Sequence, residues 1–209
     1  MLTPDAPLAQ DMLQVGNIGV HPAHGSPPSL FPDAEGRTQF ALWCILKSPL
    51  LIGTFLHNIS EATLATLTDP LAISVNQDSL GAQGSLRAHG GWAPDKPRPT
   101  TNPAYGHQVW AGPLSGGRAA VVLANLDGNR SQPLTLTSDM MPAAPQGDAG
   151  VHDHHGAEPE APAQWVIQEA FGGKKREGVT LPATAVVPPH DVAMWVLTPV
   201  TELPLATGS

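Results

Sequence analysis

Hydrophobic residues dominate the stretch ALWCILKSPLLIGTF at positions 41–55, which pauses only briefly at Lys47-Ser48. Over about residues 36–48 they occupy nearly every face of a helix, so a helix buried almost all round is predicted. Pro49 ends it, because a proline ring excludes the preceding residue from helical geometry. The run is too short between polar residues to span a membrane, which takes about 20 mainly apolar residues. We therefore expect other parts of the protein to cover it.

Two more elements are predicted next along the chain. Residues 49–53, PLLIG, are typical of a short strand buried on both faces, as in parallel sheets. Ser60 is a suitable N-cap for a helix over SEATLATLTD, and Pro70 is expected to limit its end. Its predicted inward face consists of Leu64, Leu67 and Leu71. Helix, buried strand and helix together indicate alternating α/β architecture.

From about residue 85 the hydrophobic period changes to two, the period of a β-strand. Residues 107–114 and 118–126 flank Ser115-Gly116-Gly117 and predict a β-hairpin. Further strands are predicted at 132–137, 163–170, 179–188 and 191–197. This pattern favours an antiparallel β-sandwich over residues 85–200, following an α/β region at 1–84 and preceding a tail at 201–209. Segments 94–106 and 139–163 are expected to be long exposed insertions, as their Pro, Gly, Ala and His content indicates.

Charge and cysteine content narrow the function classes. The net charge of −8 argues against nucleic-acid binding, which depends on Lys and Arg neutralising phosphates. Cys44 is the only cysteine, so no intrachain disulfide can form, and its apolar surroundings predict a buried, inert thiol. The N-terminal residues show no signal-peptide pattern of a basic region followed by an apolar one.

Five segments carry a family resemblance: DMLQVGN (11–17), RTQFALWCILKSPLLIG (37–53), AISVNQDSLGAQG (72–84), VWAGPLSGGRAAVVLAN (109–125) and VPPHDVAMWVL (187–197). In this order they resemble the C-terminal part of an α-galactosidase (melibiase) of glycoside hydrolase family 27. The resemblance implies the end of a (β/α)8 barrel followed by an antiparallel β-sandwich. It makes the helix before Pro49 the seventh barrel helix and PLLIG the eighth strand, both buried by barrel packing.

The resemblance also implies a chemistry, the retaining hydrolysis of terminal α-D-galactosides by two carboxylates. In the family these carboxylates lie on the fourth and sixth barrel strands, upstream of residue 11, so neither is expected in this chain. Asp11 and Met12 match the end of the family's Trp-Asn-Asp-Pro-Asp-Met motif and are the expected substrate-binding residues. Thr54-Phe55-Leu56 stands where the family typically has Asn-Asp-Leu. No cofactor and no metal are implied.

Two function classes remain open at the level of sequence. One is an α-galactosidase-type enzyme with a galactoside substrate, a possible homodimer, secreted or vacuolar/lysosomal in its full-length form. The other is a non-catalytic β-sandwich module for carbohydrate or protein contact. Neither class predicts binding to nucleic acid or to a membrane.

Several further motifs have simpler interpretations. His152-Asp153-His154-His155 resembles a metal tract but is expected to be a solvated insertion. Lys174-Lys175-Arg176 is expected to be a solvated hairpin tip. The tryptophans at 92, 110, 165 and 195 are predicted to lie in the core rather than to form a sugar platform. Asn58-Ile59-Ser60 and Asn129-Arg130-Ser131 fit the N-glycosylation pattern, which is short and often arises by chance.

Overall fold

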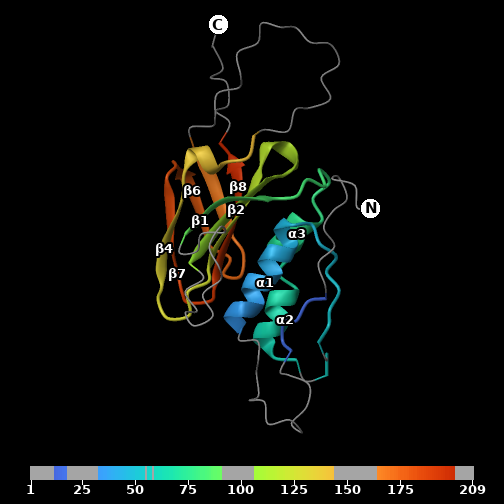
Figure 1. The fold of residues 1–209 in the computed structure, drawn as a ribbon. Coiled ribbons are helices and arrows are strands. Elements are labelled where there is room, and N and C mark those ends of the chain that lie inside the picture. The colour runs from blue at the N-terminus through green and yellow to red at the C-terminus, as the bar shows by residue number, and fades with distance from the viewer. Residues whose placement is uncertain are drawn as a thin grey trace, which may run out of the picture.

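The computed structural model describes residues 12–17, 33–54, 56–57, 59–90, 106–143 and 164–200. In this part of the chain, helices lie on one face of a six-stranded antiparallel sheet (Figure 1). A two-stranded antiparallel sheet covers the opposite face. The predicted antiparallel β-sandwich is therefore confirmed, with a helical layer added on one side.

The strands of the large sheet follow the order β1-β2-β3-β8-β5-β6. Their bounds are β1 Ser85–Gly90, β2 His107–Pro113, β3 Ala119–Asn125, β5 Trp165–Glu169, β6 Lys175–Val179 and β8 Val192–Pro199. The small sheet pairs β4 (Gln132–Leu136) with β7 (Ala183–Val187). The predicted hairpin is confirmed as β2 and β3, joined through a 3-10 turn at Ser115–Gly117 in which Gly116 and Gly117 both have φ of 70°.

Strand β3 lies at the centre of the molecule, and all seven of its residues are buried. Successive side chains of a strand point to opposite faces, so β3 contributes to two cores. Ala120, Val122 and Ala124 pack toward the helices, whereas Val121 and Leu123 pack toward β4 and β7. A strand buried on both faces explains the continuous apolar run AAVVLA.

Helix α1 (Asp33–Ile45) confirms the predicted helix. It begins and ends three residues earlier than the expected range of about 36–48. Its buried side chains include Phe40, Ala41 and Cys44, which share one core with β3 and β8. The chain leaves the helix through Leu46 and Lys47, whose φ is 54°. The helix is thus covered by the large sheet, together with α2 and α3.

The predicted helix after Ser60 divides into two short ones, α2 (Glu61–Leu67) and α3 (Pro70–Asn76). Ser60 caps α2 as expected, since its hydroxyl accepts the N–H of Thr63 at 3.0 Å. Pro70 does not limit α2 but begins α3, because the first helical position needs no N–H donor. The predicted inward face was wrong for Leu64, which is 49% exposed; the buried residues of α2 are Thr63 and Thr66.

The prediction of a fully buried strand at 49–53 was also wrong in this structure. Only one parallel bridge forms there, between Leu13 and Ile52, and no regular strand follows. Leu51 is 58% exposed and Ile52 is 43% exposed. A strand of a parallel sheet is buried only when helices cover both of its faces, and the described residues do not supply that cover.

Two predictions within the sandwich need correction. The strand expected over 179–188 is two strands in different sheets, because β6 ends at Val179 and β7 begins at Ala183. Exposure was expected over 139–163, yet Met140 and Met141 are partly buried against the core between the two sheets. Most of both predicted insertions, and Trp92, lies outside the described residues.

Candidate functional site

Met12, one of the two predicted substrate-binding residues, lies on a short two-segment edge made by residues 12–17 and 50–54. The Leu13 N–H donates to the Leu51 carbonyl at 2.8 Å, and the Gly53 N–H donates to the Leu13 carbonyl at 2.9 Å. Leu13 is buried, whereas the neighbouring Met12 is 43% exposed. The bridge therefore fixes the backbone of Met12 at the rim of the molecule. Asp11, the other predicted residue, lies outside the described residues.

Glycines allow the two segments of this edge to approach each other closely, and they allow the edge to approach α2. A Cβ at Gly53 would come within 2.9 Å of the Leu13 carbonyl oxygen and 3.1 Å of the Met12 Cβ. Gly16 has φ of 77°, a left-handed conformation that favours glycine, and a Cβ there would meet Thr63 at 2.4 Å. Gln14 adds a tie to α1, since its N–H donates to the Gln39 side chain at 2.8 Å.

This edge can bind but is not equipped for acid–base chemistry. Residues 12–17 and 50–54 contribute apolar side chains, the amides of Gln14 and Asn17 and the hydroxyl of Thr54, with no carboxylate. Retaining glycoside hydrolysis needs a pair of carboxylates beside the scissile bond. The described part of the edge can therefore offer packing and hydrogen bonds to a partner, and any proton transfer must come from elsewhere.

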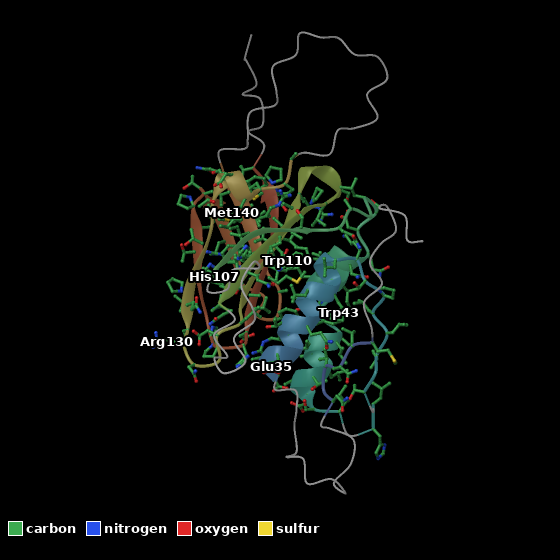
Figure 2. All side chains as sticks on the ribbon, viewed as in Figure 1. Glu35, Trp43, His107, Trp110, Arg130 and Met140 are labelled. Atoms are coloured by element: carbon green, nitrogen blue, oxygen red, sulfur yellow. The ribbon has the colours of Figure 1, made fainter. Side chains whose placement is uncertain are left out.

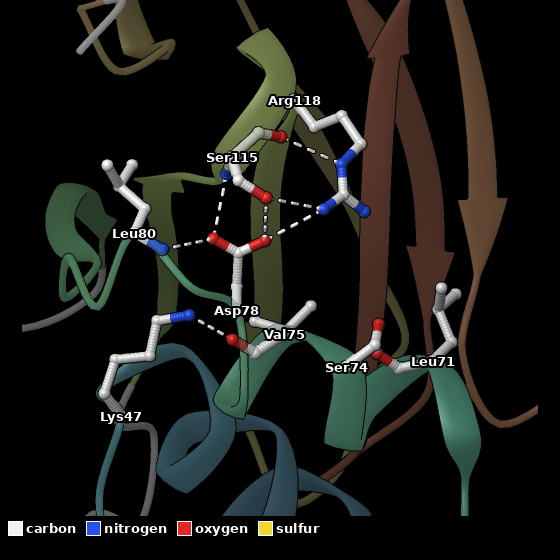
Figure 3. A network of polar contacts seen from close by, with 8 residues as sticks. All are labelled: Lys47, Leu71, Ser74, Val75, Asp78, Leu80, Ser115 and Arg118. Atoms are coloured by element: carbon white, nitrogen blue, oxygen red, sulfur yellow. Dashed lines mark hydrogen bonds and ion pairs between the residues drawn. The ribbon is translucent and has the colours of Figure 1, made fainter. Parts of the chain in front are cut away.

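A second polar site ties the end of α3 to the β2–β3 hairpin (Figure 3). Asp78, whose side chain is 2% exposed, accepts the Ser115 N–H at 2.8 Å, the Ser115 hydroxyl at 2.8 Å and the Leu80 N–H at 3.1 Å. The Arg118 Nη2 donates to the same carboxylate at 2.8 Å. Beside it, the Lys47 ammonium donates to the Val75 carbonyl. The Asp78 carboxylate thus binds Ser115 and Arg118, which lie 37 and 40 residues further along the chain.

The environment of Asp78 favours its charged form. Burial opposes ionisation, but the hydrogen bonds from the Ser115 backbone, the Ser115 hydroxyl and the Leu80 backbone outweigh it. The pKa of Asp78 consequently lies below its ordinary value of 3.8. Burial also disfavours the charged form of Lys47. Because that form is the protonated one, desolvation lowers the pKa of Lys47. These shifts mark Asp78 as a structural anion whose oxygens are already occupied.

Two further carboxylates connect the helices to the sandwich. Asp191 receives a bidentate pair from Arg37, at 3.0 Å from Nε and 2.6 Å from Nη2, and the Asp191 hydrogen bond is the main cause of the raised Arg37 pKa. Asp69 caps α3 through the Ala72 N–H at 2.8 Å and also accepts the Phe171 N–H at 2.9 Å. Asp191 and Asp69 therefore both serve the junction between the helices and the sandwich.

A shallow groove of about 350 Å³ runs beside α1 and ends at the loop before β8. It is lined by Glu35, Thr38, Gln39, Leu42, Trp43, Leu126 and His190. Figure 2 labels Glu35 and Trp43 along the helical layer, away from the small sheet. His190 and Glu35 approach at 3.4 Å. No sequence pattern predicts this groove or the Asp78 network, although Asp78 lies within one of the five resemblance segments.

The structure tests some of the predictions made for tryptophan, basic and histidine residues. Trp165 and Trp195 are buried and Trp110 is half-buried, as predicted for core residues. The solvated-tip prediction was wrong for Arg176, whose guanidinium stacks 4.7 Å above the Trp195 ring. His152–His155 lies outside the described residues, within which no cluster of metal-ligating side chains occurs. No helix in the described ranges is long and apolar enough to cross a membrane.

Cys44 lies in the core between α1 and the large sheet, so we expect it to resist chemical modification. It is fully buried, and burial raises the pKa of its thiol from 9.0 to about 12. Because the thiolate is the reactive form, native protein at pH 8 should react with a disulfide reagent only as it unfolds. Absorbance of the released thiolate, in buffer and in urea, measures this. Fast stoichiometric labelling without denaturant would contradict the packing.

The sandwich residues match a known protein family. Residues 104–197 match the family described as the α-galactosidase C-terminal β-sandwich domain. The chain is also 34% identical over 189 residues to an α-galactosidase of Oryza sativa, covering 90% of the chain and 35% of the relative. An α-galactosidase of Coffea arabica is 32% identical over 192 residues, with 90% of the chain and 39% of the relative covered. The chain thus spans little more than a third of the length of these relatives.

Solved structures show the same fold. The α-galactosidase I of Mortierella vinacea matches with a TM-score of 0.64 at 22% identity, covering 90% of this chain and 38% of the other. A family 27 β-L-arabinopyranosidase of Geobacillus stearothermophilus matches with a TM-score of 0.67 at 21% identity, covering 94% and 38%. Both coverages reach well beyond residues 104–197 and so include helical residues. The chain is therefore similar to the C-terminal part of α-galactosidases, and its residues 104–197 match their C-terminal β-sandwich domain.

Proposed function

We propose that this chain forms the C-terminal part of an α-galactosidase-type glycoside hydrolase, which hydrolyses terminal α-D-galactosides with retention of configuration. The observation that carries the proposal is the extent of the similarity. It runs over 189 residues of an α-galactosidase and is not confined to the sandwich. Helices α1 and α3 share one hydrophobic core with β3 and β8, so the helical residues and the sandwich form one structural unit.

In this proposal the helical layer is the end of a catalytic (β/α)8 barrel. The parallel bridge between Leu13 and Ile52 supports it, because parallel pairing is the pairing of barrel strands. The exposed apolar side chains of Met12, Leu51 and Ile52 support it as well, since a free-standing module gains nothing from leaving them in water. Preceding barrel strands and helices would cover this edge and bring in the two catalytic carboxylates.

The proposal gives each part of the chain a role. The sandwich braces the barrel end through the carboxylates Asp69, Asp78 and Asp191. Asp11 and Met12 are the substrate-binding residues of this proposal, with a role in binding a galactoside and none in the bond-breaking step. A secreted or vacuolar location, as the family resemblance implies, completes the proposal, and a homodimer stays a prediction.

A chimeric enzyme tests the proposal. The matched C-terminal region of the Oryza sativa α-galactosidase is replaced by the matching residues of this chain, and hydrolysis of a nitrophenyl α-galactoside is measured. We expect turnover from the chimera and none from the same enzyme ended before the matched region. A second chimera that exchanges only residues 104–197 separates the sandwich from the helical layer.

The outcomes are distinct. Soluble, monodisperse chimeras that turn over no more substrate than the shortened enzyme would overturn the proposal. If the chimera with only residues 104–197 exchanged were active and the chimera with the whole matched region exchanged were not, the helical layer of this chain could not replace the barrel end of the Oryza sativa enzyme. If calorimetry then detected binding of galactosides to the chain itself, the alternative of a non-catalytic carbohydrate-binding module would replace the enzyme.

A further inference from the structure

The turn between β3 and β4 presents a modification motif that the proposed function does not use. Residues 126–131 leave the centre of the sandwich at Asn125, whose fully buried side chain donates to the Arg130 carbonyl at 2.7 Å. Asp127 then accepts the Asn129 N–H at 2.8 Å through its carboxylate. The turn is therefore held by its backbone and by buried or half-buried side chains, which leaves the outer side chains uninvolved in the fold.

Those outer side chains are Asn129, Arg130 and Ser131, and all three residues are exposed. Figure 2 shows Arg130 at the margin of the sandwich, on the side away from Trp43 and the helical layer. Among the described residues, neither the Asn129 carboxamide nor the Ser131 hydroxyl has a hydrogen-bond partner. The three residues also form the pattern Asn-x-Ser with x other than proline, the acceptor pattern for N-glycosylation on surface loops of secreted proteins.

We propose that Asn129 is an N-glycosylation site. The co-reactant is a lipid-linked oligosaccharide pyrophosphate of the secretory pathway. The Asn129 Nδ2 forms a bond to the sugar's anomeric carbon while the bond from that carbon to the pyrophosphate oxygen breaks. The amide nitrogen loses one proton, and the lipid pyrophosphate leaves with the electron pair of the broken bond. No oxidant or reductant takes part.

The folded structure tolerates a glycan at this turn. The oligosaccharide would extend from an exposed carboxamide whose loss of one N–H breaks no contact among the described residues. The turn leads into β4, which pairs only with β7 within the described residues and so leaves one strand edge open. Unpaired strand edges favour association with other chains, and a bulky polar group beside the edge opposes that.

The second motif, Asn58-Ile59-Ser60, provides an internal contrast. Its Ser60 hydroxyl is engaged in the N-cap of α2, where it accepts the Thr63 N–H at 3.0 Å and bonds the Thr63 hydroxyl at 2.9 Å. Ile59 is partly buried. Asn58 itself lies outside the described residues. The Asn129 motif is therefore the one whose acceptor and hydroxyl side chains are both shown in an exposed position.

The experiment uses the full chain, secreted from yeast cells behind a heterologous leader and treated with an enzyme that removes N-glycans. On glycan removal, we expect the chain of natural sequence and the Asn58→Gln variant each to lose the mass of one oligosaccharide from Asn129. Asn129→Gln and Ser131→Ala should lack that step, and Ser131→Thr should keep it, because threonine retains the acceptor pattern. Peptide mass mapping after glycan removal locates the modified asparagine.

Secretion of the chain with no glycan on Asn129, or a mass step unchanged by Asn129→Gln, would overturn the proposal. A variant that is not secreted is replaced by Ser131→Ala, which alters only an exposed hydroxyl. The inference rests on the proposed function through its secretory location. The leader removes that dependence in the test, and the chimera assay measures catalysis independently, so the two proposals can fail separately.

Discussion

Purified chain 1–209 is expected to release no detectable nitrophenol from a nitrophenyl α-galactoside. Retaining hydrolysis needs two carboxyl groups about 5 Å apart, one as nucleophile and one as acid and then base. The part-buried carboxylates of Asp69, Asp78 and Asp191 are all held by hydrogen bonds from backbone, serine or arginine groups. None of them is free to attack a sugar. The expected deficit is the whole enzymatic acceleration, about 10⁶-fold or more.

The assay for this prediction compares the chain with the full-length Oryza sativa enzyme at equal concentration, over hours rather than minutes. The comparison enzyme proves that substrate and buffer are competent. Turnover of the chain well above the buffer blank would contradict the prediction, provided that Asp11→Ala abolishes it. Turnover that survives Asp11→Ala would instead indicate a contaminating glycosidase.

Replacement of Asp78 by alanine is expected to cost the folded chain about 3 kcal/mol or more, since hydrogen bonds to a charged group are each worth about 1.5–3 kcal/mol. The substitution removes the acceptor of four donors in the network of Figure 3. It leaves the Ser115 and Leu80 N–H groups without this partner at the contact between α3 and the β2–β3 hairpin. Urea unfolding followed by tryptophan fluorescence measures the loss.

Asp139→Ala is the matched control, because it removes the same charge from an exposed position. It should change the free energy of unfolding by less than about 0.5 kcal/mol, as surface substitutions usually do. Equal destabilisation by both variants would show that net charge, rather than the network, matters.

The same network predicts a pH dependence. The pKa of Asp78 is lower in the folded chain than its ordinary value of 3.8, so its ionisation stabilises the fold at neutral pH. That contribution is complete above the unfolded pKa and is lost as the pH falls through the folded pKa. Asp78→Asn should therefore show a smaller loss of stability than the unmodified chain on acidification below about pH 4. A parallel decline in both proteins would contradict this assignment.

Local patterns in the sequence were sufficient to predict the sandwich and the first helix. Alternation with a period of two identifies strands without knowledge of their partners, and Ser115-Gly116-Gly117 forms the hairpin turn because two residues there need positive φ. The apolar residues of α1 likewise predicted a buried helix, but not that burial is complete on one face only, since Leu42 and Trp43 are half-buried and line the groove. The family resemblance added what no periodicity can supply, the relation to α-galactosidases.

Tertiary structure alone decided which apolar residues are covered. Leu64 and Ile52 have the sequence context of core residues, yet both are exposed, since burial depends on a neighbouring surface and not on the residue itself. It also decided the polar junctions. Asp78 and Arg118 are 40 residues apart, and nothing in either local segment predicts their 2.8 Å contact. Sequence patterns report interactions within a few residues, whereas contacts between layers depend on how the sheet and helices pack.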